Sequence, residues 1–403
     1  MGGEDPVKKC CRVTVFVLFI LLLPPTASLS HFGANTIIYV DDMLGEGPDN
    51  PPEGFTSIQE AIDNAVDGDS IYVYEGIYYE NIIINKSINV IGEKRETTII
   101  DGKAMDDTVW IKTSQVNFSG FTVQNATRDF WCVGIHVIEK KWWPVSDPPA
   151  HLSHIHLSHC IVKNNIAGIR PTETSEISIT NCSIYNNSAN CIKIYNSSNL
   201  SISHCLIHHN GEYMDDTTYS GGISISAGDR PEENCQSITI DNCTIHENIG
   251  TGIAIATGAK DTLVEYNTIS NNDGIGLHIQ NCDTIVRKNR IIGNGGNEFM
   301  DAGIHISDAC FNRIENNEIS LNKPDGIFLL RSEKNVIIKN NFINNTRQAY
   351  FSLRSSFWNQ WKNNYWDDWI GMGPKVIHGT VCAYLLPWVN FDWNPVKYKI
   401  PLC

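Results

Sequence analysis

A phrase made of a glycine followed by alternating apolar and polar residues returns along most of this chain. The sequence GIHI at 303–306, for example, is followed by GIFL at 326–329. Where no insertion intervenes, successive phrases begin 22 to 27 residues apart. They begin at Gly134, Gly168, Asn190, Gly222, Gly252, Gly276, Gly303, Gly326 and Ala349. A repeat of this period predicts a solenoid, in which each unit packs only against its neighbours.

A second apolar phrase lies between the glycine phrases, at 178–184, 201–207, 239–245, 264–269, 313–319 and 338–343. Both phrases alternate apolar with polar residues, which is the period of a strand. Each is short and bounded by Asn, Gly, Asp and Ser, as turns require. No helical segment separates them. We therefore predict an all-β fold, a single-stranded right-handed parallel β-helix whose equivalent strands pair from coil to coil.

One register of the repeat carries the same side chain in successive coils. It reads Cys160, Cys182, Cys205 and Cys243, and then Asn267, Asn289, Asn317 and Asn341. A column that changes once from thiol to amide predicts an internal ladder, with like side chains stacked about 4.8 Å apart. If these thiols were not superposed, the solenoid would be misassigned.

The first 30 residues have the plan of a secretory signal peptide. Lys8, Lys9 and Arg12 precede an apolar run from Val13 to Leu23, and small residues follow. A charged start, a short apolar run and small residues are typical of such peptides. We therefore expect a secreted or cell-surface protein, with an uncleaved membrane anchor as the alternative.

These patterns divide the chain into four segments. They are the signal peptide at 1–30, an N-terminal cap with the first coils at 31–102, the β-helix repeats at 103–357 and a C-terminal cap at 358–403. A chain of 403 residues would otherwise suggest two or three domains. A solenoid removes that need, because it grows without adding separate cores.

The composition excludes some classes of partner. The formal net charge of −15 repels nucleic acid, and a membrane is expected to contact only the N-terminal segment if that segment is uncleaved. Nine Asn-x-Ser/Thr sites occur, and one or two exposed ones are expected to be glycosylated in a host that has the machinery. They are Asn85, Asn117, Asn125, Asn181, Asn186, Asn196, Asn199, Asn242 and Asn344.

Thirteen cysteines in an exported chain suggest disulfides, but their spacing leaves the pairs open. The thiols of the ladder are expected to be buried as small apolar groups. Cys382 and Cys403 are candidate partners in the irregular C-terminal segment. Cys282 and Cys310 follow equivalent strands of neighbouring coils and form another candidate pair.

Residues 55–102 resemble the opening of pectin-lyase-like right-handed β-helix proteins, including pectin methylesterases. The apolar face of the expected capping helix consists of Ile58, Ala61, Ile62 and Ala65. A turn at Gly68-Asp69, a strand and the sequence GIYYE at 76–80 then follow, as in that family.

Residues 363–400 are similar to the tail of exported archaeal β-helix proteins and of NosD, a family that matures copper sites. An aromatic cluster is expected to plug the last coil and consists of Trp358, Trp361, Tyr365, Trp366, Trp369, Trp388 and Trp393. The resemblance implies the fold but leaves the function open, because the same fold serves binding proteins, lyases, hydrolases, esterases and epimerases. A NosD-like copper role would need exposed soft ligands, whereas the cysteine column is expected to point inward.

Few acids match the catalytic motifs of enzymes with this fold. Hydrolysis of a glycosidic bond needs two carboxyl groups, one on each side of the bond. Of the four motifs that polygalacturonases carry, only the Asp-Asp pair has a match here, at Asp215 and Asp216. Asp301 occupies the equivalent turn three coils later. These three acids are the candidate catalytic residues, and ordinary turn residues are the alternative.

The outward position after each Gly-Ile pair predicts a stripe along one face of the solenoid. It reads His136, Arg170, Lys193, Ser224, Ala254, His278, His305, Phe328 and Phe351. Arg170 and Lys193 are expected to bind an anionic sugar. His278 and His305 could also bind it or share a metal ion, although two histidines alone make a weak metal site. Lyases that resemble this chain use calcium on such a face, which makes calcium a possible cofactor; an ordinary solvent-facing strand is the alternative.

Aromatic residues in the insertions offer flat surfaces for sugar rings. They are Trp142, Trp143, Tyr213, Tyr219 and Phe299. Insertions in solenoids form loops that commonly bind ligands. The leading hypothesis is therefore an exported protein that binds carbohydrate, such as a cell-surface glycan. The rivals are a lyase or hydrolase that acts on acidic glycans, and a structural or adhesion element.

Overall fold

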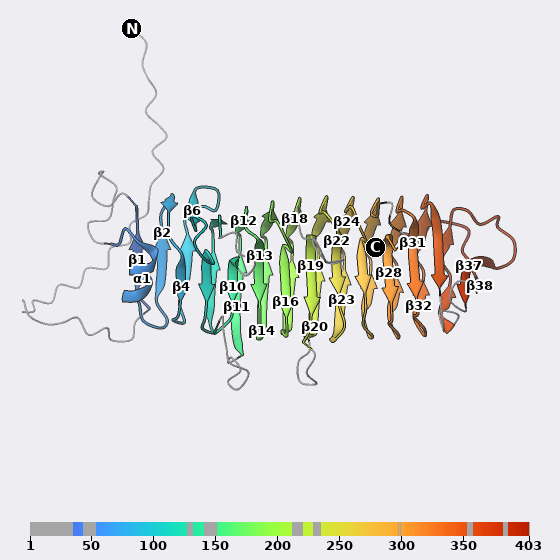
Figure 1. The fold of residues 1–403 in the computed structure, drawn as a ribbon, viewed down its shortest axis with the longest axis horizontal. Coiled ribbons are helices and arrows are strands. Elements are labelled where there is room, and N and C mark those ends of the chain that lie inside the picture. The colour runs from blue at the N-terminus through green and yellow to red at the C-terminus, as the bar shows by residue number, and fades with distance from the viewer. Residues whose placement is uncertain are drawn as a thin grey trace, which may run out of the picture. The chain divides into compact units, whose positions relative to one another are not determined.

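The computed structural model describes residues 35–42, 54–126, 132–140, 151–211, 221–228, 235–296, 298, 300–352, 358–381 and 386–402. These residues lie in one unit, Asn35–Cys403. Successive coils lie side by side along one axis, and most contribute three strands (Figure 1). Equivalent strands pair in parallel and form three stacks, which we call sheets 1, 2 and 3.

Sheet 1 contains the glycine phrases. Its strands follow one another as β4 (Ile82–Ile84), β7 (Val109–Ile111), β10 (Val133–Val137), β13 (Ala167–Pro171), β16 (Ile192–Tyr195), β19 (Gly221–Ser226), β22 (Thr251–Ile255), β25 (Leu277–Ile279), β28 (Ala302–Ser307), β31 (Asp325–Leu330), β34 (Arg347–Ser352) and β37 (Lys375–Val381). A Cβ atom at Gly276 would lie 2.6 Å from the carbonyl oxygen of Gly303. The phrase begins with glycine because the backbones of adjacent coils approach so closely there.

Sheet 2 follows sheet 1 within each coil. Its strands are β1 (Ile37–Val40), β2 (Ser70–Val73), β5 (Asn89–Gly92), β8 (Val116–Ser119), β11 (Leu152–Ser158), β14 (Thr174–Thr180), β17 (Ser198–Ser203), β20 (Cys235–Asp241), β23 (Ala259–Glu265), β26 (Ile285–Arg287), β29 (Arg313–Glu315), β32 (Val336–Ile338), β35 (Gln360–Lys362) and β38 (Leu386–Asp392). The antiparallel pair β37–β38 joins sheet 2 to sheet 1 at the C-terminal end.

Sheet 3 completes the coil with short strands. They are β3 (Gly76–Tyr78), β6 (Thr98–Asp101), β9 (Thr122–Gln124), β12 (Ile161–Lys163), β15 (Ser183–Tyr185), β18 (Leu206–His208), β21 (Thr244–His246), β24 (Thr268–Ser270), β27 (Arg290–Ile292), β30 (Glu318–Ser320), β33 (Asn341–Ile343) and β36 (Tyr365–Trp366). Branched apolar side chains from all three sheets fill one continuous core. Ile135, Ile169 and Ile192, for example, pair in register and are fully buried.

The cysteine column is superposed, as the sequence predicted. Cys160, Cys182, Cys205 and Cys243 are all buried, and each thiol donates to the backbone carbonyl two residues before it. The carbonyls of Cys160, Cys182 and Cys205 accept from the residue after the cysteine of the next coil, which superposes the four positions. The backbone N–H of Cys243 then donates to Oδ1 of Asn267 at 2.8 Å. From there the ladder continues in one file through Asn289, Asn317, Asn340 and Asn364 to Asp392.

The prediction that Asn341 belongs to this ladder is wrong. Asn340 occupies the inward position, and its Nδ2 donates to Oδ1 of Asn364 at 3.1 Å. Asn341 instead donates to the backbone carbonyl of Ile400 at 2.8 Å. A shift of one residue turns a side chain to the opposite face, and two adjacent asparagines fit the pattern equally well.

A second amide ladder runs parallel to the first, at the turns that follow sheet 3. It consists of Asn165, Asn187, Asn210, Asn248, Asn272, Asn294, Asn322 and Asn345. Each Nδ2 donates to Oδ1 of the next asparagine, with distances from 2.9 to 3.2 Å. Two internal ladders therefore hold the coils in register.

The helix α1 (Ile58–Asn64) covers the first coils, as the sequence predicted. Ile58, Ala61 and Ile62 are fully buried. The carboxylate of Glu80 accepts bonds of 2.9 Å from the backbone N–H groups of Ile58 and Gln59. The last residue of the GIYYE sequence thus satisfies N–H groups that the first turn of a helix leaves without partners.

The aromatic cluster near the C-terminus plugs the last coil only in part. Trp361 and Trp366 are 4% and 2% exposed, and the Trp366 ring stacks on Phe342 with centroids 4.1 Å apart. Trp358, Trp388 and Trp393, in contrast, are exposed. The expectation that the whole cluster fills the coil is therefore wrong for these three, because β38 and the segments beside it lie at the surface.

Cys282 and Cys310 form a disulfide between neighbouring coils, with Cα atoms 4.8 Å apart. This confirms the second candidate pair. Cys382 and Cys403 lie outside the described residues, as does the segment 1–30. In the part of the chain that the structure describes, no helix is both long and apolar enough to span a membrane.

We predict that Asn289→Ala lowers the urea concentration at the unfolding midpoint. Asn289 donates to the carbonyl of Val264 at 2.8 Å and to Oδ1 of Asn317 at 3.0 Å, and it accepts from the N–H of Asn267 at 2.9 Å. Alanine would leave each of these buried groups without a partner, at about 1–3 kcal/mol per group. Asn117→Ala, at an exposed strand position, is the control. Equal midpoints for the two variants would contradict a stabilising role for the ladder.

Candidate functional site

The outward stripe on sheet 1 is continuous, because its members pair in register from β7 to β34. It reads Trp110, His136, Arg170, Lys193, Ser224, Ala254, His278, His305, Phe328 and Tyr350. The prediction of Phe351 as its last member is wrong. Phe351 pairs with the inward Leu329 and is fully buried. The glycine phrase of this coil begins one residue before Ala349, which reverses the two faces.

Much of the stripe is covered, although its side chains point away from the coil interior. His136 is 7% exposed, His278 is 3% exposed and His305 is 2% exposed. Phe328 is fully buried. This face therefore differs from an ordinary solvent-facing strand, and neither His278 nor His305 offers an accessible ring in this conformation.

The C-terminal half of the stripe is an aromatic column. The rings of His278 and His305 stack with centroids 4.8 Å apart, and His305 stacks on Phe328 at the same distance. Nε2 of His278 lies 2.9 Å from Oγ of Ser307. The nitrogen lone pairs of the nearly parallel His278 and His305 rings lie in parallel planes. In this arrangement the lone pairs do not converge on one metal ion.

The N-terminal half of the stripe is basic. Arg170 and Lys193 occupy equivalent positions on β13 and β16, whose strands pair through Ile169 and Ile192. Both side chains are half-buried. Burial lowers the pKa of Arg170, and burial together with the neighbouring Arg170 lowers the pKa of Lys193. Two cations side by side in a desolvated position favour the binding of an anion between them.

A buried acid–histidine pair lies next to these cations. Nδ1 of His136 is 2.8 Å from Oδ2 of Asp107, and both side chains are almost fully buried. Oδ1 of Asp107 accepts from the backbone N–H of Val133 at 2.6 Å. The negative charge of Asp107 also favours the charged form of Arg170. A carboxylate in this position orients an imidazole and stabilises its protonated form, as general acid–base chemistry requires.

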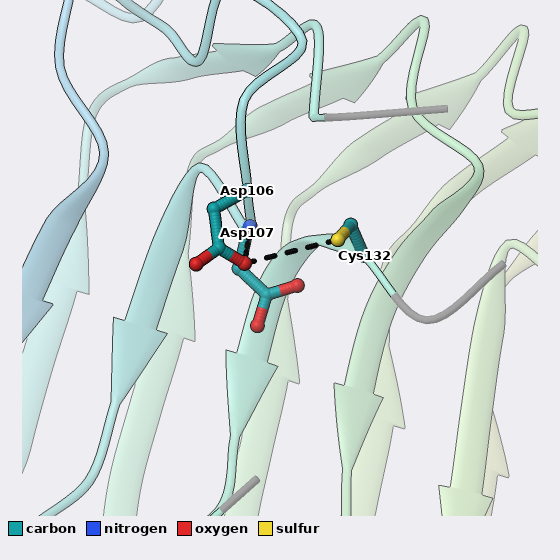
Figure 2. A group of neighbouring side chains, drawn as sticks. All are labelled: Asp106, Asp107 and Cys132. Carbon is teal, nitrogen blue, oxygen red and sulfur yellow. Dashed lines mark hydrogen bonds between the residues drawn. The ribbon is translucent and has the colours of Figure 1, made fainter. Parts of the chain in front are cut away.

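Asp106, Asp107 and Cys132 have ligand atoms that all lie within 4.8 Å of one another. Figure 2 shows the two carboxyl groups and the thiol facing one another at the start of β7 and β10. Sγ of Cys132 donates to Oδ1 of Asp106 at 3.7 Å. Calcium takes six to eight oxygen ligands, whereas this group supplies two carboxylates and a soft thiol. Asp107 is also engaged by His136 and by Val133, so the group fits a hydrogen-bonded network better than a calcium site.

A cavity of about 450 Å³ opens at the turns that precede β7, β10, β13 and β16. Six of its nine lining residues are polar and three are apolar. The polar residues are Lys103, Asn125, Asn164, Asn165, Asn186 and Ser188, and the apolar ones are Ala104, Ala126 and Ile166. These turns lead into the strands that carry Trp110, His136, Arg170 and Lys193. Neutral polar groups of this kind suit the hydroxyl groups of a sugar.

Asp301 does not join this group. Oδ2 of Asp301 accepts from the backbone N–H groups of Gly296 and Glu298 at 2.9 and 3.1 Å, as an ordinary turn residue does. The remaining candidates lie outside the described residues: Trp142, Trp143, Tyr213, Asp215, Asp216, Tyr219 and Phe299.

Sequence reasoning missed Asp107, Cys132 and Trp110. The sequence could have indicated them, because the repeat pattern that defines the stripe continues into the coil before the first glycine phrase at Gly134. Asp107 precedes the outward Trp110 by three residues, just as the buried Asp325 precedes Phe328. The spacing does not show which side chain each of these two acids pairs with.

We predict that His305→Phe weakens the dependence of stability on pH. Burial lowers the pKa of His278 to about 4 and that of His305 to about 3, whereas an unfolded histidine titrates near 6.5. As the pH falls from about 6.5, the unfolded chain therefore binds protons that the folded chain does not, and stability is lost. Each such group contributes up to about 1.4 kcal/mol per pH unit.

The measurement is the urea midpoint at several pH values between 7 and about 4. His156→Phe, at an exposed position of β11, is the control. The slope should be shallower for His305→Phe than for the wild type or the control. Identical slopes would show that burial of this ring does not couple folding to protons.

Comparison with known proteins agrees with this architecture. The sequence model described as "Right handed beta helix region" matches residues 107–260, 167–343 and 232–380. No curated protein sequence matches the chain.

Three solved structures illustrate the likeness. The A-module of mannuronan C-5 epimerase AlgE6 from Azotobacter vinelandii has a TM-score of 0.59 at 15% identity, covering 84% of this chain and 92% of its own. The A-module of AlgE4 from the same organism has a TM-score of 0.59 at 13% identity, covering 85% and 96%. DFA-IIIase from Arthrobacter chlorophenolicus A6, in complex with GF2, has a TM-score of 0.53 at 14% identity, covering 75% and 87%.

At these identities the structures share the fold alone. The sequence match extends over more than half of the chain, and the coil geometry agrees with it. The chain belongs to the right-handed β-helix family.

Proposed function

We propose that this protein binds an acidic polysaccharide at the basic half of the sheet 1 stripe. The observation that carries the proposal is the pair Arg170 and Lys193, two half-buried cations at equivalent positions of adjacent coils. Among the described residues no carboxylate forms an ion pair with Lys193. A uronate carboxylate would offset the mutual repulsion of the two groups and accept charge-assisted hydrogen bonds from them.

Two further observations favour a sugar over another anion. The polar cavity before β7, β10, β13 and β16 supplies amide and hydroxyl groups for sugar hydroxyls. Trp110 lies in the same stripe and offers an aromatic ring. Similar folds occur in enzymes whose names refer to mannuronan, an acidic polymer, which supports the same class of ligand.

The location of the protein follows as part of this proposal. Segment 1–30 would direct export, so that the site meets glycans outside the cell or at its surface. The net charge of −15 would keep the rest of the surface from binding polyanions. Binding would therefore be restricted to the local basic pair.

We predict that Lys193→Ala and Arg170→Ala each weaken binding of polymannuronate by tenfold or more. Each substitution removes a charge-assisted hydrogen bond, whose contribution of about 1.5–3 kcal/mol corresponds to this factor. The affinity of the full chain would be measured by titration calorimetry, with a neutral glucan as the comparison ligand. Lys260→Ala, at an exposed position of β23, is the matched control. Equal affinities for all variants, or equal binding of the neutral glucan, would contradict the proposal.

A second candidate function is eliminative cleavage of the same polymer. The buried Asp107–His136 pair beside the two cations favours it. In such a reaction a base removes the proton at C5 of the uronate, and the C–H electrons form the C4–C5 double bond. The C4–O bond then breaks, and the leaving oxygen takes up a proton. The cations would stabilise the charge that develops on the carboxylate.

We expect the wild-type protein to release unsaturated uronate ends from polymannuronate, detected by their ultraviolet absorbance. Asp107→Asn should lower that rate by about a hundredfold, because the imidazole would lose its orienting carboxylate. Lys260→Ala should leave the rate unchanged. If the wild type releases no product while Lys193→Ala still loses affinity, the protein binds without cleaving.

A further inference from the structure

The outward face of sheet 3 carries a histidine cluster on a different side of the coil from the sheet 1 stripe. Tyr185, His208 and His246 pair in register on β15, β18 and β21. Their rings stack with centroids 5.0 Å apart for Tyr185 and His208, and 5.2 Å apart for His208 and His246. The stacking aligns two imidazoles on adjacent coils.

The residues that follow these two histidines complete the cluster. His209 and Glu247 have φ angles of 54° and 52°, and the backbone N–H of His209 donates to the carbonyl of Glu247 at 3.1 Å. This left-handed conformation is uncommon for residues other than glycine. At both turns it places the side chain beside the ring of the residue before it.

Short contacts connect all four side chains. Nδ1 of His208 lies 2.7 Å from Nδ1 of His209. Nδ1 of His246 lies 3.0 Å from Oε2 of Glu247. Nε2 of His209 lies 3.5 Å from the same oxygen. Three imidazoles and one carboxylate therefore meet at the surface of two adjacent coils.

The contact between His208 and His209 limits their protonation. Two nitrogens 2.7 Å apart can share one proton, but two positively charged rings would repel each other. Burial, followed by the neighbouring His246 and His209, lowers the pKa of His208. A metal ion binds an imidazole through an unprotonated nitrogen and would take the place of the shared proton.

We propose that His208, His209, His246 and Glu247 bind one divalent transition-metal ion of the zinc class. Imidazole nitrogen and carboxylate oxygen are ligands that zinc prefers, and four of them complete a tetrahedral structural site. The four donors do not all converge on one point in this structure. Unlike the buried rings of His278 and His305, the side chains of His209 and Glu247 are about half exposed and that of His246 is partly exposed. Binding would require these side chains to turn from their stacked arrangement toward one point.

The position suggests what the ion would do. His208 and His246 belong to coils whose ladder asparagines, Asn210 and Asn248, are 38 residues apart in sequence. The preceding step, from Asn187 to Asn210, takes 23 residues. The ion would therefore connect the two coils on either side of an insertion. It would restrain the coil that contains the insertion.

The test is titration of the untagged full chain with Zn²⁺, measured by calorimetry and by the thermal unfolding temperature. We expect one ion to bind at this cluster with micromolar or stronger affinity and to raise the unfolding temperature. His246→Ala and Glu247→Gln should each weaken that binding at least tenfold and remove most of the thermal shift. His156→Ala, an exposed histidine on β11, should behave as the wild type.

A second measurement distinguishes this cluster from the group formed by Asp106, Asp107 and Cys132. Co²⁺ bound by nitrogen and oxygen in a tetrahedral site gives visible bands, whereas a thiolate ligand adds an intense band in the near ultraviolet. We expect the visible bands alone, and we expect them to persist in the double variant Asp106→Asn/Cys132→Ser. Failure of Zn²⁺ to bind would overturn the proposal. Binding that persists in both His246→Ala and Glu247→Gln would overturn it as well.

Discussion

Hydrogen bonds between buried amides, which run along the axis from coil to coil, hold the coils from Asn165 onward in register. Each asparagine of the two ladders donates to the next coil and accepts from the previous one. A buried amide that loses a partner costs about 1–3 kcal/mol, so a coil cannot shift by one residue without losing several such bonds. The thiol column from Cys160 to Cys243 precedes the first of these ladders and fills the same register with small buried side chains. The ladders therefore determine which residues point outward as well as which point inward.

The outward stripe of sheet 1 is a consequence of that register, and its two halves have different chemistry. The basic half places Arg170 and Lys193 side by side and sets a buried acid–histidine pair next to them. The aromatic half stacks His278, His305 and Phe328 and buries them. Burial keeps the two histidines neutral over most of the pH range, whereas the half-buried cations keep a charge that an anion can offset. We therefore place the proposed anion site in the basic half.

Much of the fold could be predicted, because the pattern that encodes it is repeated many times. The cysteine column was correct, since one thiol per coil at a constant spacing has few alternative alignments. The two register errors occurred where neighbouring residues fit equally well. Asn341 stands beside Asn340, and Phe351 follows a phrase whose first residue is Gln348 instead of glycine. The capping helix was also correct, because its apolar spacing is local. Its partner Glu80 lies 22 residues from Ile58, so that contact depends on the fold.

The candidate site shows the same division. Arg170 and Lys193 could be placed on one face from the repeat alone. The pairing of Asp107 with His136 could not, because 29 residues separate them and only the stacking of their coils brings them together. The disulfide between Cys282 and Cys310 was one of several pairings that spacing allowed, and only the superposition of their coils selected it.

By itself the sequence determined the solenoid, its period, its inward thiol and amide columns and its helical cap, because each of these is encoded by local alternation that repeats. The tertiary structure decided which of two adjacent residues enters a ladder, which outward side chains become buried, and which distant acids and histidines meet. Those outcomes depend on contacts between coils, and insertions of unequal length separate the coils along the chain. No local pattern contains that information.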